Sequence, residues 1–227
     1  MTFRDPRADL VAEAYRRAKG HVAYLDESYQ APDAVAAHRQ TFYIFTAVIV
    51  SPEARDELRS SLREIAGVQR WHTTEALLTG PGRETTRKML EFLAEGDEVC
   101  VIAHQVPVGA GDHDAEDARR ACYRGLAASL AAGRAGHWGP IELLVLEERN
   151  QRNFRNKDHK NHAELIAEKR IPRSTRLLQV SPAHERLLWL PDLVSSAYRR
   201  TLTHHDATRE LFGVVESHVH FVEPSAE

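Results

Sequence analysis

Acidic side chains follow two apolar segments of the chain, at the point where each predicted strand ends. Asp26 and Glu27 come directly after residues 21–25, and Glu147 comes after residues 141–146. Ligands of α/β proteins gather in the crevice beyond strand ends, where loops leave room for them. Carboxylates are ligands that hard divalent cations such as Mg²⁺ and Mn²⁺ prefer. We therefore expect these side chains to form part of a metal site.

A third acidic residue lies near the start of the last predicted helix. Asp192 lies off the apolar stripe of that helix, on a face that it shares with Ser195, Ser196 and Arg199. Two metal ions held by such carboxylates could activate water and stabilise the leaving oxygen in phosphodiester cleavage. Each carboxylate alone is more simply explained by solvation of a turn or by the helix dipole. The functional interpretation therefore depends on their coming together.

The segment of residues 149–176 is basic and begins directly after the acidic pair Glu147-Glu148. Lysine and arginine side chains beside a carboxylate site would bind the phosphate backbone of a nucleic acid, and Phe154 could stack on a base. The residues that we expect to contact substrate are Arg149, Arg152, Arg155, Lys157 and Lys160. A solvated, partly mobile surface loop is an equally good interpretation of this charge run.

Hydrophobic patterns predict the elements that would position these residues. Residues 41–50 are rich in aromatic and β-branched side chains and should pair as a hairpin with the strand at 21–25. The further expected strands cover residues 99–106, 141–146 and 176–180. One helix is expected to begin at Ser51. The other expected helices cover residues 83–94, 115–132, 161–169 and 187–202. A hairpin followed by strands that alternate with helices predicts an α/β fold, a mixed β-sheet flanked by helices. No linker divides the chain, so residues 1–227 should form one domain with a core at about 20–203 and a tail at 204–227.

Several short motifs resemble the domain of unknown function 3800 family. The matching segments are Tyr-Leu-Asp-Glu-Ser at 24–28, the strand at 42–50, Leu-Leu-Val-Leu-Glu at 143–147, and Ser181 followed by 187–194. The resemblance spans about residues 20–203 and implies a ribonuclease H-like fold with a metal-dependent nuclease-type site. If the family pattern is carried over to this chain, the catalytic metal ligands would be Asp26, Glu147 and Asp192. The resemblance leaves Glu27 and Glu75 as further candidate ligands.

The chain also departs from that family pattern. Tyr29 stands where the family usually has glycine, and Glu147 replaces the commoner aspartate. Trp189 and Pro191 replace the usual glutamine and alanine before Asp192. None of these changes removes a carboxylate. They nevertheless keep open the alternative of a catalytically silent member that acts as a nucleic-acid-binding or regulatory module.

His72 lies beside Trp71 in a short segment between two predicted helices. Its imidazole could position a phosphate or shuttle a proton, so it is a candidate substrate-binding residue. The alternative is a packed Trp-His pair with a satisfied imidazole.

Composition limits the class of protein. The formal net charge of −3 excludes a protein that coats nucleic acid through bulk positive charge. Two cysteines do not make a disulfide framework, and neither a signal peptide nor a membrane span is visible, which together predict a cytoplasmic protein without a membrane partner. The sequence therefore favours a nuclease that cleaves nucleic acid with metal-activated water. A hydrolase of a small phosphorylated metabolite stays possible.

Overall fold

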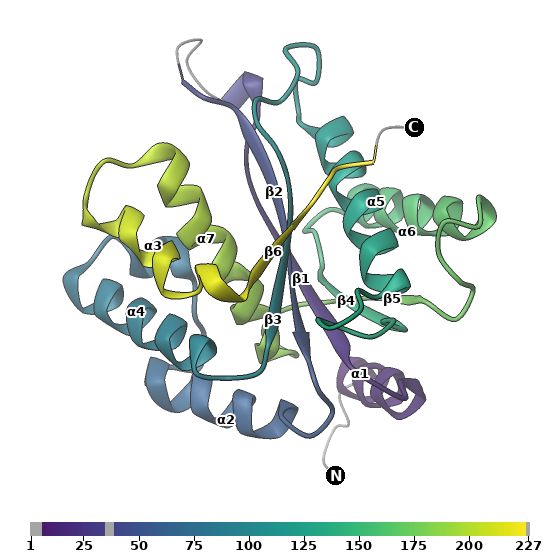
Figure 1. Cartoon of the computed structure of the whole chain (residues 1–227), viewed down its shortest axis with the longest axis horizontal. Coiled ribbons are helices and arrows are strands. Elements are labelled where there is room, and N and C mark those ends of the chain that lie inside the picture. Colours follow the sequence, from purple (N-terminus) through teal and green to yellow (C-terminus); the bar gives the residue numbers. More distant parts are fainter. Residues whose placement is uncertain (1–5, 35–38, 226–227) are drawn as a thin grey trace.

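The computed structural model describes residues 6–34 and 39–225 and shows an α/β fold. A six-stranded mixed sheet with the strand order β5-β4-β1-β2-β3-β6 is flanked by helices on both faces, as the sequence predicted (Figure 1). The strands are β1 Val22–Gln30, β2 Phe42–Val50, β3 Val99–Gln105, β4 Leu143–Glu147, β5 Arg176–Val180 and β6 Val219–Val222. β2 is antiparallel to both β1 and β3, whereas β4 is parallel to β1 and to β5, and β6 is parallel to β3.

Strands β1 and β4 form a fork that creates the candidate site. β1 pairs with β2 along its full length, from Val22 to Gln30, but it pairs with β4 only from Val22 to Leu25. The expectation that β1 ends before Asp26 was therefore wrong. Polar residues can continue a strand that keeps one pairing partner, and here the hairpin partner β2 carries β1 five residues beyond its last β4-paired residue, Leu25. The strand that ends near Asp26 is the parallel neighbour β4.

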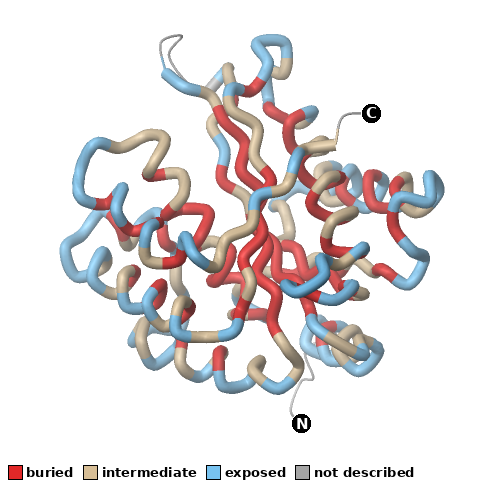
Figure 2. Tube along the Cα trace, in the orientation of Figure 1, coloured by how far each residue is buried: buried red, intermediate tan, exposed pale blue. Residues whose placement is uncertain are grey.

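The helices are α1 Pro6–Arg17, α2 Arg55–Ala66, α3 Thr73–Ala76, α4 Gly80–Ala94, α5 Glu116–Ala132, α6 Arg152–Ala167 and α7 Trp189–Thr203. Helices α2, α4 and α7 lie on one side of the sheet in Figure 1, and α5 and α6 lie on the other. Each face has its own apolar core, as the alternation of side chains along a strand requires. Figure 2 shows buried residues following the strands through the middle of the molecule. All nine residues of β2 are buried because both of its faces are covered.

Besides the end of β1, the predicted boundaries of α2, α6 and the C-terminal segment were wrong. Helix α2 begins at Arg55, because Ser51 accepts a hydrogen bond from the Ala54 backbone N–H and caps a turn before the helix. Helix α6 begins at Arg152, nine residues before its predicted start. Its buried residues are Asp158, Asn161, His162 and Leu165, so it packs largely through polar groups and shows no apolar stripe in the sequence.

The third boundary concerns the C-terminal segment. Val219–Val222 joins the sheet as β6 beside β3 and is not a tail outside the core elements. The helices of the described residues include none that is long and apolar enough to cross a membrane.

Candidate functional site

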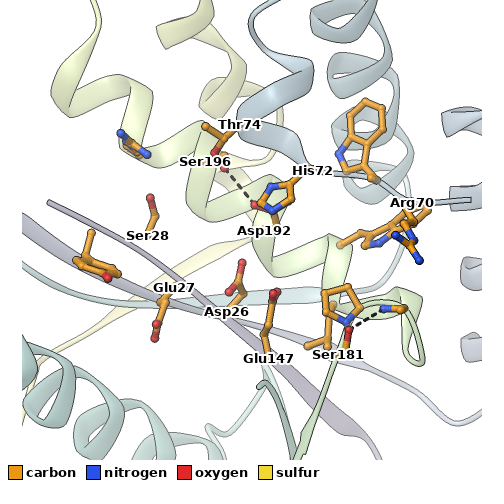
Figure 3. Close-up of a pocket in the computed structure, with 17 residues that line it drawn as sticks. Asp26, Glu27, Ser28, Arg70, His72, Thr74, Glu147, Ser181, Asp192 and Ser196 are labelled. Carbon is orange, nitrogen blue, oxygen red and sulfur yellow. Dashed lines mark hydrogen bonds between the residues drawn. The ribbon is translucent and has the colours of Figure 1, made fainter. Parts of the chain in front are cut away.

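A cleft of about 620 Å³ opens at the fork between β1 and β4. It lies between the ends of these strands, helix α7 and the segment that leads into α3, as Figure 3 shows. The residues that line it are Asp26, Glu27, Ser28, Tyr29, Arg70, Trp71, His72, Thr74, Glu147, Ser181, Pro182, Ala183, Leu188, Trp189, Asp192, Ser196 and Arg199. The three carboxylates predicted to act together are all among them.

The strand register brings Asp26 and Glu147 side by side. Leu25 pairs with Leu146 across the parallel strands, so the residues that follow each of them stand next to one another. Both carboxylates lie on the sheet face that α7 covers, because Tyr24 and Val145, two residues earlier on each strand, belong to the core on that face. Asp26 is 9% exposed and lines the cleft.

Helix α7 supplies the third carboxylate from its first turn. The Oδ2 atom of Asp192 accepts a hydrogen bond of 3.1 Å from the backbone N–H of Thr73, and its Oδ1 atom accepts one of 3.3 Å from the Ser196 hydroxyl. These two donors fix the orientation of the carboxylate. In Figure 3, Asp26, Glu147 and Asp192 point into the same space from three different elements.

Burial and mutual repulsion make the three carboxylates hard to ionise together. Burial, followed by the charges of Glu147 and Asp192, raises the pKa of Asp26 well above its usual range. Burial and the charge of Asp192 raise the pKa of Glu147 to about 7. Burial also raises the pKa of Asp192, although its hydrogen bonds from Thr73 and Ser196 partly oppose the shift. A cluster of this kind favours a proton or a cation from outside.

The donor set fits a hard divalent cation. Within residues 6–34 and 39–225, neither Asp26 nor Glu147 accepts a hydrogen bond from a protein group, so their oxygens are free to bind a ligand. Oxygen-only ligands at a partly open site are what Mg²⁺ and Mn²⁺ take, together with water. No group of three acidic, histidine or cysteine side chains is already close enough to hold an ion in the described part of the chain. Asp26, Glu147 and Asp192 would therefore have to draw together around a cation.

The two further candidate ligands lie apart from this cluster. Glu27 follows Asp26 on the strand and so points to the opposite face, where its carboxylate accepts a 2.7 Å hydrogen bond from the Tyr43 hydroxyl and pairs with Arg119. Figure 3 shows Glu27 pointing away from Asp26. Glu75 is exposed on α3 and is not among the residues that line the cleft. The structure thus brings together three of the five predicted ligands.

His72 lies at the rim of the cleft, immediately before α3. It is exposed, and Figure 3 shows its ring beside Asp192. Its charge lowers the pKa of both Glu147 and Asp192, opposing the effect of burial. Trp71 donates its indole N–H to Thr73 over 3.0 Å and so does not hold the imidazole. His72 is thus free to contact a ligand in the cleft.

Much of the basic segment is helical, and three of its basic side chains are paired with acidic neighbours. Helix α6 covers residues 152–167, so the loop interpretation was wrong there. Arg149 and Lys157 both pair with Glu116 of α5, a residue that is distant from both of them in the sequence. Lys160 lies 3.9 Å from Glu164 on its own helix, and Arg155 donates hydrogen bonds to backbone carbonyls of residues 149 and 150.

Only part of the basic segment reaches the carboxylates. Arg149 lines a cavity beside Asp26 and Glu147, whereas Lys157 and Lys160 line a separate one between α5 and α6. Arg152 is exposed at the first turn of α6. Arg152 and Arg155 are absent from the lining of both cavities.

Two arginines in the cleft were not predicted as substrate contacts. Arg70 and Arg199 line it, and within the described residues neither of them forms an ion pair. Burial lowers the pKa of Arg199, whose guanidinium lies 5.8 Å from the centre of the Phe42 ring. The helical spacing of Arg199 from Asp192, seven residues or two turns, was a usable signal. Arg70 offered none, because its place depends on the path of the chain before α3.

Comparisons with known proteins leave the family open. No protein-family model matches the chain, and no curated protein sequence matches it.

Proposed function

We propose that this chain is a metal-dependent phosphodiesterase of the ribonuclease H-like type, a nuclease that cleaves nucleic acid. The mixed sheet with its opening hairpin supports that fold assignment, and the short motifs support membership of the domain of unknown function 3800 family. Because unrelated activities share folds, the activity itself is inferred from the site.

One observation carries the proposal. Asp26, Glu147 and Asp192 come from two strands and a helix, yet they meet in one cleft, where burial and the charges of neighbouring carboxylates raise the pKa of Asp26 and of Glu147. Buried charges that stabilise a fold are normally paired, so three carboxylates that repel one another weaken it. Such strain is typical of functional sites, where an external ligand relieves it.

The residues of the cleft then have distinct roles. Asp26, Glu147 and Asp192 would hold Mg²⁺ or Mn²⁺, which when bound lowers the pKa of water and stabilises the leaving oxygen of a phosphodiester. Thr73 and Ser196 keep the Asp192 carboxylate oriented. Arg70 and Arg199 are placed to bind non-bridging phosphate oxygens, and His72 is placed to exchange a proton with the leaving group.

The test is cleavage of labelled oligonucleotides by the full chain with millimolar Mn²⁺ or Mg²⁺ and with EDTA. We expect cleavage that EDTA abolishes, and we expect Asp26→Asn to lower the rate by about 10³-fold or more, because it removes a charged ligand without changing side-chain size. Asn156→Ala, at an exposed position of α6, is the matched control and should retain the wild-type rate.

Three outcomes would replace the proposal. Cleavage by Asp26→Asn at the wild-type rate would remove the carboxylates from the mechanism. Nucleic-acid binding that is independent of metal, with no cleavage, would establish the catalytically silent module in its place. Hydrolysis of small phosphate esters alone would indicate a metabolite phosphatase.

A further inference from the structure

A second cavity continues the cleft past the carboxylates. It measures about 320 Å³ and shares Asp26, Glu27, Tyr29 and Glu147 with the first. Its other walls come from the segment between β4 and α6, including Arg149, Asn150 and Phe154. The carboxylate cluster therefore lies between two adjoining lobes, with room for substrate on either side.

The fork between the strands explains this continuity. Beyond Leu25, the edge of β1 that faced β4 has no strand partner among the described residues, because β4 ends at Glu147. Residues 26–30 of β1 thus form a ridge whose side chains alternate between the two sheet faces. Asp26 and Ser28 lie on the α7 face, and Glu27 and Tyr29 lie on the α5 face. A chain-like ligand can cross this ridge from one lobe to the other.

Tyr29 is an exposed aromatic ring on that ridge. Its side chain is 46% exposed and lines both lobes. One ring face stacks on Tyr43 with centroids 5.3 Å apart and an interplanar angle of 13°, which leaves the other face open.

The ring beneath Tyr29 is rigidly held. Tyr43 is 2% exposed, its hydroxyl donates to Glu27 over 2.7 Å, and it accepts a hydrogen bond of 2.8 Å from Arg119. A ring stacked on such a base is ordered before any ligand binds, which lowers the entropic cost of binding.

We propose that the two lobes hold a single-stranded nucleic acid across the carboxylates, with an unpaired base stacked on Tyr29. This inference rests on the proposed function and specifies its substrate. Stacking on an aromatic side chain needs a base whose face is free, whereas bases within a duplex are covered by their neighbours. Such stacking does not require a particular nucleotide sequence, because every base has a π-face. A mononucleotide would occupy only one lobe.

The experiment measures binding without cleavage. The full-length Asp26→Asn protein, alone or combined with a change at Tyr29, is titrated against fluorescently labelled single-stranded and duplex oligonucleotides, with anisotropy as the readout. We expect Tyr29→Ala to weaken single-strand binding by about 5- to 100-fold, the usual effect of losing one base–aromatic stack. Tyr29→Phe keeps the ring and should restore most of the affinity.

Phe221→Ala is the matched control, because Phe221 is equally exposed at 46% but lies on β6, away from both lobes. It should leave the affinity unchanged. Tighter binding of the single strand than of the duplex, lost in Tyr29→Ala and kept in Tyr29→Phe, supports the inference.

Two results overturn it, and they differ in what they say of the proposed function. If the wild-type chain cleaves with Mn²⁺ but Tyr29→Ala binds and cleaves like wild type, Tyr29 is not a base platform and the nuclease assignment stands. If no oligonucleotide is bound or cleaved, both proposals fail.

Discussion

Two groups of buried charges on opposite faces of the sheet differ in how their charges are balanced. On the α5 face, Asp158 accepts a 2.9 Å hydrogen bond from Arg119 and one of 3.0 Å from Gln179. On the α7 face, Asp26 and Glu147 adjoin each other with no such donor among the described residues. The first, balanced group has its partners within the chain, whereas the second, unbalanced group needs a ligand. The difference separates residues that hold the fold from residues that are available for chemistry.

Removing one partner from the balanced group should have the largest effect on stability. Asp158→Ala would remove one of the two carboxylates that pair with the buried Arg119 guanidinium, and we expect the free energy of unfolding to fall by about 3–5 kcal/mol. Urea denaturation of the two proteins measures this difference. Asn156→Ala on the same helix is the control and should cost less than about 0.5 kcal/mol. A loss below about 1 kcal/mol for Asp158→Ala would show that the two groups do not differ as described.

The unbalanced group should instead make the metal-free protein less stable as pH rises. The pKa of Glu147 is raised to about 7 in the folded chain from about 4.3 in an unfolded one, so the folded state binds more protons between these values. The stability that this proton contributes is present below pH 4.3 and is lost as pH rises through 7. In EDTA, we expect the free energy of unfolding to fall by about 2 kcal/mol between pH 5 and pH 8 because of this group.

Glu147→Gln isolates this contribution from the histidines that titrate in the same range. The variant should be more stable than wild type at pH 8 and should show a flatter dependence on pH, measured by urea denaturation. Glu75→Gln, the same substitution at an exposed residue, should keep the wild-type slope. Equal slopes for wild type and Glu147→Gln would mean that neither burial nor the charge of Asp192 raises the pKa of Glu147.

The sequence predicted the sheet better than it predicted the helix beside the site. β2 and β5 were expected within a residue of their observed bounds, because both are compact runs of strand-forming residues. Helix α6 was largely missed, because it buries Asp158 and His162 against α5 through hydrogen bonds. A hydrophobic pattern does not detect packing of that kind.

The candidate site could be predicted only as far as each residue carried a local signal. Asp26, Glu147 and Asp192 each stand out against an apolar run, and the structure does bring them together. The lobes on either side could not be predicted, because they depend on β1 continuing past its parallel neighbour β4. Tyr29 reaches the cleft only through that geometry.

The central claim, that the three carboxylates hold a divalent cation, is tested most directly by thermal unfolding with Mn²⁺ and with EDTA. A ligand that binds only the folded chain stabilises it by about 1.4 kcal/mol at ten times its dissociation constant. We expect millimolar Mn²⁺ to raise the Tm of wild type and of Asn156→Ala. The Tm of Asp26→Asn and of Asp192→Asn should not change. An equal rise in all four proteins, or no rise in wild type, would contradict the account.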